Sequence, residues 1–225
     1  MCQSCGVTLR ATLFDMDGLL FDSEVLWHDA ELEIFGGLGV PIPEAQNRST
    51  KGMYVTDVVE YWYARYPWSG PNHDEVGNQL LERVGELVER QGQMMPGAIR
   101  ALDLTSARGP IALASSTPLS LIYRSLDHFN LRDRFASIHS AELEPYGKPH
   151  PGVFLSAADS LGVAAIDCLV IEDSAAGVLA AKSASMDVIA VPTPEDRSLP
   201  AFLLADLVLA SLDELSVEWL DERFA

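Results

Sequence analysis

The sequence has few basic residues and no long apolar run. Lys and Arg together number 15 against 33 Asp and Glu, which gives a formal net charge of −18. This excess argues against binding to nucleic acid or to an anionic membrane surface, because both carry negative charge themselves. No apolar stretch approaches the roughly 20 residues that a membrane-spanning helix needs, and residues 1–10 lack the apolar core of a signal peptide. We therefore expect a cytoplasmic protein without a nucleic-acid or membrane partner.

Cysteine is also rare, with three residues in the chain. Cys2 and Cys5 have the C-x-x-C spacing found in zinc and redox sites. Structural zinc normally takes four ligands, however, and no second Cys or His pair follows at a suitable spacing. We therefore expect no metal or redox role for Cys2 and Cys5. Cys168 lies in an apolar run and is expected to pack in the core.

Short apolar runs alternate with helical patterns over most of the 225 residues. This alternation is typical of a doubly wound, mostly parallel Rossmann-like α/β sheet. The predicted strands lie near residues 10–14, 110–115, 136–140, 167–171, 187–191 and 206–210. The helices between them are predicted to begin near Gly97, Pro118, Pro151, Ser174 and Leu212.

A long insertion after the first strand has helical periodicity and no strand signal. Its apolar residues fall into three sets, namely Leu26, Ala30, Ile34 and Leu38, then Val55, Val58, Val59 and Trp62, then Leu80, Leu81, Val84, Leu87 and Val88. We predict a helical-bundle cap at residues 23–93, inserted into a Rossmann-like core made of residues 1–22 and 94–225. Two short connections would let this cap act as a lid over the loop that follows the first strand.

Two acids and a glycine follow the first predicted strand. The apolar run Ala11–Phe14 stops at Asp15, and Asp17 and Gly18 come shortly after it. Because glycine tolerates a positive φ, the chain can turn tightly here and direct both carboxylates into the crevice above the sheet. Such a pair can bind a hard cation such as Mg²⁺ and still present one oxygen as a nucleophile.

Three later junctions carry further polar groups. The second predicted strand runs into Ser115 and Ser116, whose hydroxyls suit a phosphate beside the N–H groups of a helix start. Lys148 precedes a proline that restricts the backbone, just before a helical pattern. The fourth strand ends at Glu172 and Asp173. An acid, a hydroxyl, a lysine and a second acid thus follow one another at four junctions.

In this order, the four motifs resemble those of the haloacid dehalogenase-like (HAD) superfamily of phosphohydrolases. The matching residues are Asp15, Asp17, Gly18, Asp22 and Ser23 in the first motif, Ser115 in the second, Lys148 in the third, and Glu172 and Asp173 in the fourth. The inserted cap resembles the subgroup that contains β-phosphoglucomutase and small sugar phosphatases. Within that subgroup, residues 60–68 look most like the bacterial hexitol phosphatase and 2-deoxyglucose-6-phosphate phosphatase branch.

The resemblance implies a Mg²⁺-dependent phosphatase. Asp15 would attack the phosphoryl group and form an aspartyl-phosphate, while Asp17 would act as acid toward the leaving oxygen and later as base toward water. The metal ligands would be Asp15, the backbone carbonyl of Asp17, Asp173, and Glu172 directly or through water. The substrate would contact Asp15, Met16, Asp17, Ser115, Ser116 and Lys148.

Several other polar and aromatic residues are expected to have structural roles or to line the substrate site. Asp22 and Ser23 are expected to cap the first cap helix, and Trp27 could offer a flat apolar wall to a sugar. The aromatic residues within 61–68 are expected to form cap core. Three histidines without partners at metal-ligand spacing are expected to be structural or exposed, namely His128, His139 and His150.

Several alternatives stay open beside the phosphatase. The β-phosphoglucomutase pattern has a His and, in the cap, an Arg that grips a second phosphate. This sequence has Trp27 and Val55 at those positions, although Arg65 or Lys51 could hold the second phosphate instead. A haloacid dehalogenase uses a similar aspartate but does not need Asp17 or a Mg²⁺ site, so the presence of Asp17 argues against this activity. A signalling receiver domain combines similar residues but is much shorter and has no inserted cap. We therefore expect a monomeric phosphatase for a small sugar or sugar-alcohol phosphate whose identity the sequence does not give.

Overall fold

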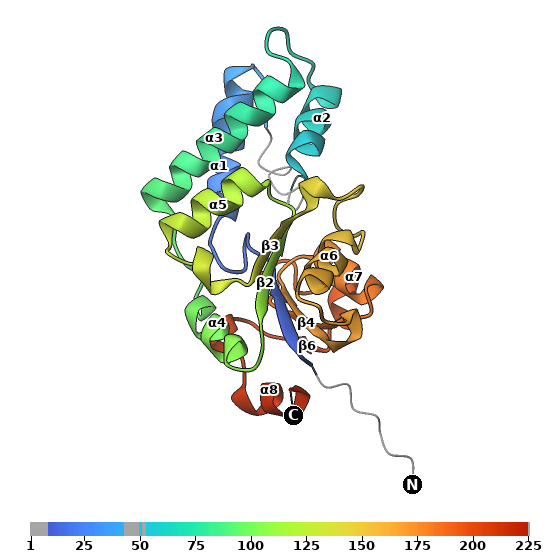
Figure 1. Ribbon diagram of the computed structural model, residues 1–225. Helices are drawn as coiled ribbons and strands as arrows, with labels where there is room; N and C mark the ends of the chain where they lie inside the picture. Colours follow the sequence, from blue (N-terminus) through green and yellow to red (C-terminus); the bar gives the residue numbers. More distant parts are fainter. Residues whose placement is uncertain (1–8, 43–49, 51–52, 225) are drawn as a thin grey trace.

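The computed structural model describes residues 9–42, 50 and 53–224, and a six-stranded parallel sheet forms its centre (Figure 1). The strand order is β3-β2-β1-β4-β5-β6. The strands are β1 (Ala11–Phe14), β2 (Ile111–Ser115), β3 (Ser137–Ser140), β4 (Cys168–Glu172), β5 (Asp187–Ala190) and β6 (Leu207–Val208). This confirms the predicted doubly wound fold. The last strand is shorter than the predicted 206–210 because it lies at the sheet edge and pairs with only the end of β5.

Helices cover both faces of the sheet (Figure 1). One face carries α4 (Ala98–Ser106), α5 (Leu119–His128) and α8 (Val217–Arg223), and the other carries α6 (Gly152–Ser160) and α7 (Ala175–Ser183). Short 3₁₀ turns connect these elements, namely η2 (Arg132–Arg134), η3 (Ala141–Leu143), η4 (Ala165–Asp167), η5 (Pro200–Leu204) and η6 (Leu212–Glu214).

The prediction that the last helix begins near Leu212 is wrong. Leu212 opens the 3₁₀ turn η6, and α8 begins at Val217. The reason is a local cap, because the Ser216 hydroxyl accepts a hydrogen bond from the Trp219 N–H at 3.2 Å and starts the helix there.

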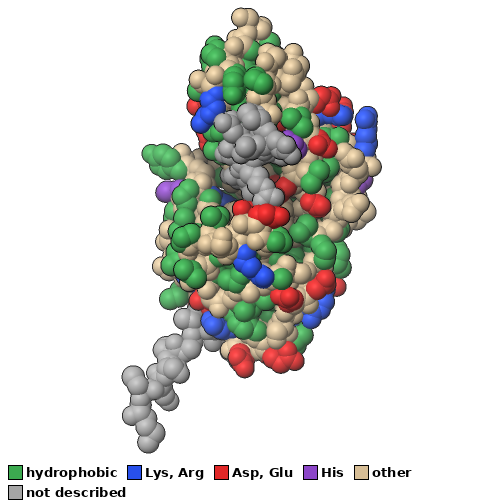
Figure 2. Space-filling view, turned by 180° about the vertical axis from the view of Figure 1, so that it is seen from behind, with side chains coloured by type: hydrophobic (Ala, Val, Ile, Leu, Met, Phe, Trp, Pro, Cys, Tyr) green, Lys and Arg blue, Asp and Glu red, His purple; other side chains and the backbone are tan. Residues whose placement is uncertain are grey.

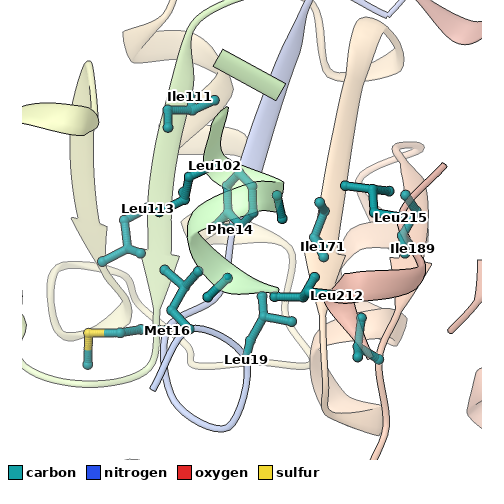
Figure 3. Close-up of a cluster of buried hydrophobic side chains, with 14 of the residues drawn as sticks. Phe14, Met16, Leu19, Leu102, Ile111, Leu113, Ile171, Ile189, Leu212 and Leu215 are labelled. Carbon is teal, nitrogen blue, oxygen red and sulfur yellow. The ribbon is translucent and has the colours of Figure 1, made fainter. Parts of the chain in front are cut away.

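The core lies on both faces of the sheet, so the central strands are apolar on both sides. In β1, Ala11 and Leu13 pack toward α6 and α7, whereas Phe14 packs toward α4 and α5. Figure 3 shows the second of these clusters, in which Phe14 lies near Leu102 of α4. The continuous apolar runs seen in the sequence therefore reflect burial on two sides.

Three helices form a separate bundle beyond the carboxyl ends of the strands (Figure 1). They are α1 (Glu24–Gly37), α2 (Val55–Arg65) and α3 (His73–Gln91), and they share a core built around residues such as Phe35, Trp62 and Leu80. Leu121 of α5 also packs in this core, which fixes the bundle against the sheet layer. The domain boundaries at residues 22/23 and 93/94 stay a prediction. Within the described residues, no helix has both the length and the apolar character that a membrane crossing needs.

Candidate active site

A cavity of about 230 Å³ lies between the carboxyl ends of the strands and the cap helices. Strand order reverses between β1 and β4, which is where ligands bind in open α/β sheets. Asp15 follows β1, Ser115 ends β2, and Glu172 ends β4, so the parallel register brings these three residues to the same edge. Lys148 reaches the same place from the loop before α6. The structure therefore gathers residues from all four sequence motifs in one cavity.

Lys148 connects two buried carboxylates. Its Nζ donates to Asp15 Oδ1 at 2.6 Å, to Glu172 Oε1 at 2.7 Å and to the Ala114 carbonyl at 3.1 Å. Burial alone would lower the pKa of Lys148, but the charges of Asp15 and Glu172 raise it above its ordinary value. Lys148 therefore stays positively charged, and its charge is shared between two acids.

One lysine does not balance the acids around it. Burial raises the pKa of Asp15 to about 7, against the opposing effect of Lys148, and the nearby charges of Glu172 and Asp17 raise it further. A carboxyl group with this pKa is partly protonated at neutral pH. The site would therefore hold a fully ionised Asp15 more easily if a second positive charge entered it.

Three carboxylates are arranged so that they could hold such a charge. Asp15, Glu172 and Asp173 are buried, and each places one oxygen within 4.8 Å of the others. Gly18 lies against them with a φ of +75°, and a Cβ there would come within 2.5 Å of Asp173 Oδ2. Only glycine fits this close approach. Clustered carboxylate oxygens are the donor set of hard divalent cations, so the residues present fit a metal ion.

Asp17 lies between the cap and the core. Its Oδ1 accepts hydrogen bonds from Ser23 Oγ at 2.6 Å and from Trp27 Nε1 at 3.2 Å, and its Oδ2 accepts one from Thr117 Oγ1 at 2.6 Å. Ser23 and Trp27 belong to the start of the cap, whereas Thr117 follows β2 in the core. The orientation of the Asp17 carboxylate therefore depends on how the cap sits over the sheet.

The predicted capping role of Ser23 is right in position but wrong for its side chain. Ser23 does occupy the N-cap position of α1, but its backbone is already helical, with φ −98° and ψ −13°, and its side chain makes no capping hydrogen bond. A capping side chain normally needs an extended backbone at this position. The hydroxyl donates to Asp17 instead. Trp27 does line the cavity, and its ring N–H is also a hydrogen-bond donor.

Of the remaining predicted substrate contacts, Ser115 and Ser116 line the cavity, whereas the Met16 side chain does not. Ser115 Oγ accepts a hydrogen bond from the Thr117 N–H at 3.1 Å, which leaves the Ser115 hydroxyl proton able to point at a ligand. Ser116 also lines the cavity. The side chain of Met16 instead packs in the core beside the sheet (Figure 3). Any contact from Met16 to a substrate would therefore come from its backbone.

Thr117 and Glu31 are among the residues that face the cavity but escaped the sequence prediction. Thr117 lies two positions after Ser115, and only its bond to Asp17 reveals a role. Glu31 is one helical turn after Trp27 on α1, so the helical spacing from Trp27 could have indicated it. Burial raises the pKa of Glu31, against the opposing hydrogen bonds from Trp62 and Thr50. Cys2, Cys5 and Lys51 lie outside the described residues.

Acidic side chains also appear around the middle of one face of the molecule, below the cap (Figure 2). The cavity itself is lined by six acids, namely Asp15, Asp17, Glu24, Glu31, Glu172 and Asp173. Lys148 is the one Lys or Arg among its lining residues in the described part of the chain. An anionic ligand would therefore need a cation to enter with it or before it.

Known proteins resemble the chain over most of its length. Residues 9–185 match the family model described as "haloacid dehalogenase-like hydrolase". Hexitol phosphatase B of Escherichia coli K12 is 44% identical over 212 residues, which cover 93% of this chain and 96% of that protein.

Solved structures agree with this match. CbbY from Rhodobacter sphaeroides, crystallised in complex with phosphate, has a TM-score of 0.83 at 26% identity and covers 93% of this chain and 97% of that one. β-Phosphoglucomutase from Clostridium difficile has a TM-score of 0.81 at 26% identity, covering 96% of this chain and 97% of that one. Fold, motif geometry and sequence likeness thus lead to one conclusion: the chain belongs to the haloacid dehalogenase-like hydrolase family and is an enzyme of the phosphatase type.

Proposed function

We propose that this enzyme is a Mg²⁺-dependent phosphatase that hydrolyses small sugar or sugar-alcohol phosphates through an aspartyl-phosphate on Asp15. The observation that carries the proposal is the position of Asp15. Its carboxylate follows the central strand at the topological switch point, is held by Lys148, and shares a cavity with Asp17, Ser115 and an acid cluster suited to a cation.

The reaction divides into two displacements on phosphorus. In the first, an Asp15 oxygen forms a bond to phosphorus while the bond to the sugar oxygen breaks, and Asp17 gives its proton to the departing alkoxide. In the second, Asp17 takes a proton from water, the water oxygen attacks phosphorus, and the bond to Asp15 breaks. Both steps use the same carboxyl group of Asp17, and the three donors on it keep it in place.

Lys148 and Ser115 would hold the transferring group. Lys148 touches Asp15 and can share its charge with the phosphoryl oxygens as they approach. The Ser115 hydroxyl has its proton available for a phosphoryl oxygen, because its own oxygen already accepts from Thr117. Such fixed donors supply much of the rate in phosphoryl transfer, where charge spreads over the equatorial oxygens.

Mg²⁺ would be held by Asp15, Asp173, the Asp17 carbonyl, and Glu172 directly or through water. When bound, it would neutralise charge on the phosphoryl group and keep Asp15 ionised. One oxygen of Glu172 already accepts a hydrogen bond from Lys148, and the other accepts one from the Ser174 N–H at 2.7 Å. These bonds favour a contact between Glu172 and Mg²⁺ through water.

The substrate class rests on the likeness to hexitol phosphatase B and on the cavity. Its volume of about 230 Å³ suits a small molecule. Hydrolysis is favoured over a mutase reaction because, among the described residues, neither Val55 at the position of the mutase Arg nor its possible replacement Arg65 lines the cavity. Val55 packs in the cap core, and Arg65 stacks on Tyr61 with its guanidinium carbon 3.4 Å from the ring centroid. Neither could grip a second phosphate there.

A phosphate-release screen over hexitol, hexose, pentose and triose phosphates tests the proposal. We expect release from hexitol phosphates or 2-deoxyglucose 6-phosphate with Mg²⁺ and none with EDTA. Asp15→Asn should abolish it, whereas the matched control Asp22→Asn, in the same loop but exposed, should not. Asp15→Asn activity within about tenfold of wild type would remove the nucleophile role.

The mutase alternative needs its own assay. Incubation of β-glucose 1-phosphate with a trace of the 1,6-bisphosphate should give free phosphate and little glucose 6-phosphate. Faster formation of glucose 6-phosphate than of phosphate would show that the enzyme is a mutase instead.

A further inference from the structure

Glu31 is a buried carboxylate on the cap side of the cavity, and the two displacement steps do not use it. It belongs to α1, is 7% exposed, and lines the cavity together with Trp27 and His28. A charged side chain is rarely buried in this way unless its hydrogen-bonding capacity is used.

Two neighbours hold the carboxylate in one orientation. Trp62 Nε1 donates to Oε2 at 3.0 Å, and Thr50 Oγ1 lies 3.0 Å from Oε1 and 3.1 Å from Oε2. Trp62 is fully buried in the cap core, so its indole is a fixed donor. Thr50 and Trp62 therefore position Glu31 rather than neutralise it.

The bonds that the described residues make leave part of the Glu31 carboxylate unused. An ionised carboxylate has about four acceptor positions, and two donors engage it here. Among the described residues, no Lys or Arg forms an ion pair with Glu31. Glu31 lines the cavity in which the leaving alcohol would lie, so a hydroxyl of that alcohol could use this remaining capacity.

We propose that Glu31 determines specificity by accepting hydrogen bonds from the hydroxyl groups of the leaving alcohol. The ligand class is a phosphate ester with a polyhydroxylated, uncharged tail, so the inference rests on the proposed sugar-phosphatase function and deepens it. A carboxylate only accepts hydrogen bonds. Esters whose tails lack donors would leave it desolvated and unsatisfied, and a site built to pair a hydroxyl rejects analogues without one.

The position of Glu31 links this recognition to the reaction. Trp27, one turn earlier on the same helix face, donates to Asp17. One face of α1 thus contacts the acid that protonates the leaving oxygen and the tail attached to that oxygen. A correctly bound tail would hold the same helix that orients Asp17.

The test compares two substrates of equal chain length. Sorbitol 6-phosphate carries hydroxyls along its tail, and hexyl phosphate carries none. The quantity measured is the ratio of their kcat/KM values, which does not depend on how much of a variant is folded. The variant Glu31→Gln keeps the shape but removes the charge. The control Glu33→Gln makes the same change on the same helix at a side chain that is 57% exposed and bonded to Arg83.

Glu31→Gln should lower the ratio about tenfold or more, because a hydrogen bond to a charged acceptor is lost only with the hydroxylated substrate. Glu33→Gln should leave the ratio within about twofold of wild type. A Glu31→Gln ratio equal to that of wild type would overturn the inference and leave the phosphatase proposal intact. Wild-type enzyme that hydrolyses hexyl phosphate but not sorbitol 6-phosphate would overturn the proposed substrate class and this inference together.

Discussion

Gly177, in the first turn of α7, is the position where one added methyl group should disturb the site most. A Cβ there would lie 1.7 Å from Glu172 Oε1 and 1.9 Å from its carboxyl carbon, so the two cannot coexist. Glu172 is fully buried and bonded to Lys148 Nζ at 2.7 Å and to the Ser174 N–H at 2.7 Å. Gly177→Ala must therefore push the carboxylate away from both donors.

The magnitude follows from what the displacement breaks. Losing one partner of a buried ion pair costs about 3–5 kcal/mol. Replacing a helical glycine by alanine returns about 1 kcal/mol in backbone entropy. The net expectation is a loss of about 2–4 kcal/mol in the free energy of unfolding, together with loss of turnover, because Lys148 also holds Asp15.

Urea unfolding followed by circular dichroism measures the first effect, and a phosphate-release assay measures the second. The matched control is Gly36→Ala in α1, where an added Cβ would meet no atom within 4 Å. That variant should gain about 0.5–1 kcal/mol and keep its activity. If Gly177→Ala were as stable and as active as wild type, the position of Glu172 would not matter and the reasoning about the lysine bridge would be refuted.

Three other substitutions test separately the charge of Asp15, proton transfer by Asp17 and the orientation of the Asp17 carboxylate by Trp27. Because the pKa of Asp15 is raised from 3.8 to about 7, the metal-free folded state holds a proton that the unfolded state has released, so its stability should fall as pH rises through this window. Asp15→Asn should lack this pH-dependent loss, so its melting temperature should fall less than that of wild type between about pH 6 and pH 8 without metal; an equal fall in both proteins would contradict the raised pKa. Asp17→Asn should still release nitrophenolate from p-nitrophenyl phosphate in an initial burst, since that leaving group needs no proton, and then turn over about 10²–10⁴-fold more slowly; an unchanged steady rate would place the base elsewhere. Trp27→Phe keeps the aromatic surface but removes the N–H, so kcat should fall about threefold to tenfold with little change in KM; a change in KM alone would make Trp27 only a wall.

The sheet could be predicted from the sequence because its signals are local. β1, β2 and β4 are buried on both faces, so each appears in the sequence as a short apolar run ended by a polar residue. Their parallel arrangement then brings the strand ends together, which is why the sequence alone predicts that Asp15, Ser115 and Glu172 meet. The start of α8 could not be predicted in this way, because a serine cap and a 3₁₀ turn compete within a few residues.

The contacts between cap and core were not predictable from local patterns. Asp17 accepts hydrogen bonds from residues 6, 10 and 100 positions away in the sequence. Which donors reach it depends on how α1 packs against the sheet layer, and this packing involves residues such as Leu121 that are distant in the chain. The sequence predicts a helix cap for Ser23 because capping depends on nearby residues, whereas the bond from Ser23 to Asp17 is a tertiary contact. Helical spacing from Trp27 could have indicated that Glu31 faces the cavity, but its hydrogen bond from Trp62 could not be predicted locally, since Trp62 lies on another helix.

The charge of the protein and the charge of its proposed substrate have the same sign, and the site explains how they can meet. Lys148 cannot attract a phosphate by itself, because Asp15 and Glu172 already share its charge. Burial raises the pKa of Asp15, and the neighbouring charges of Glu172 and Asp17 raise it further, so the surroundings of Asp15 disfavour its full ionisation. A divalent cation would relieve this repulsion and would also supply the attraction for the phosphate, so binding of metal and substrate should be cooperative. The acids that make the empty cavity unfavourable to anions are thus the same groups that would make the metal-loaded cavity selective for them.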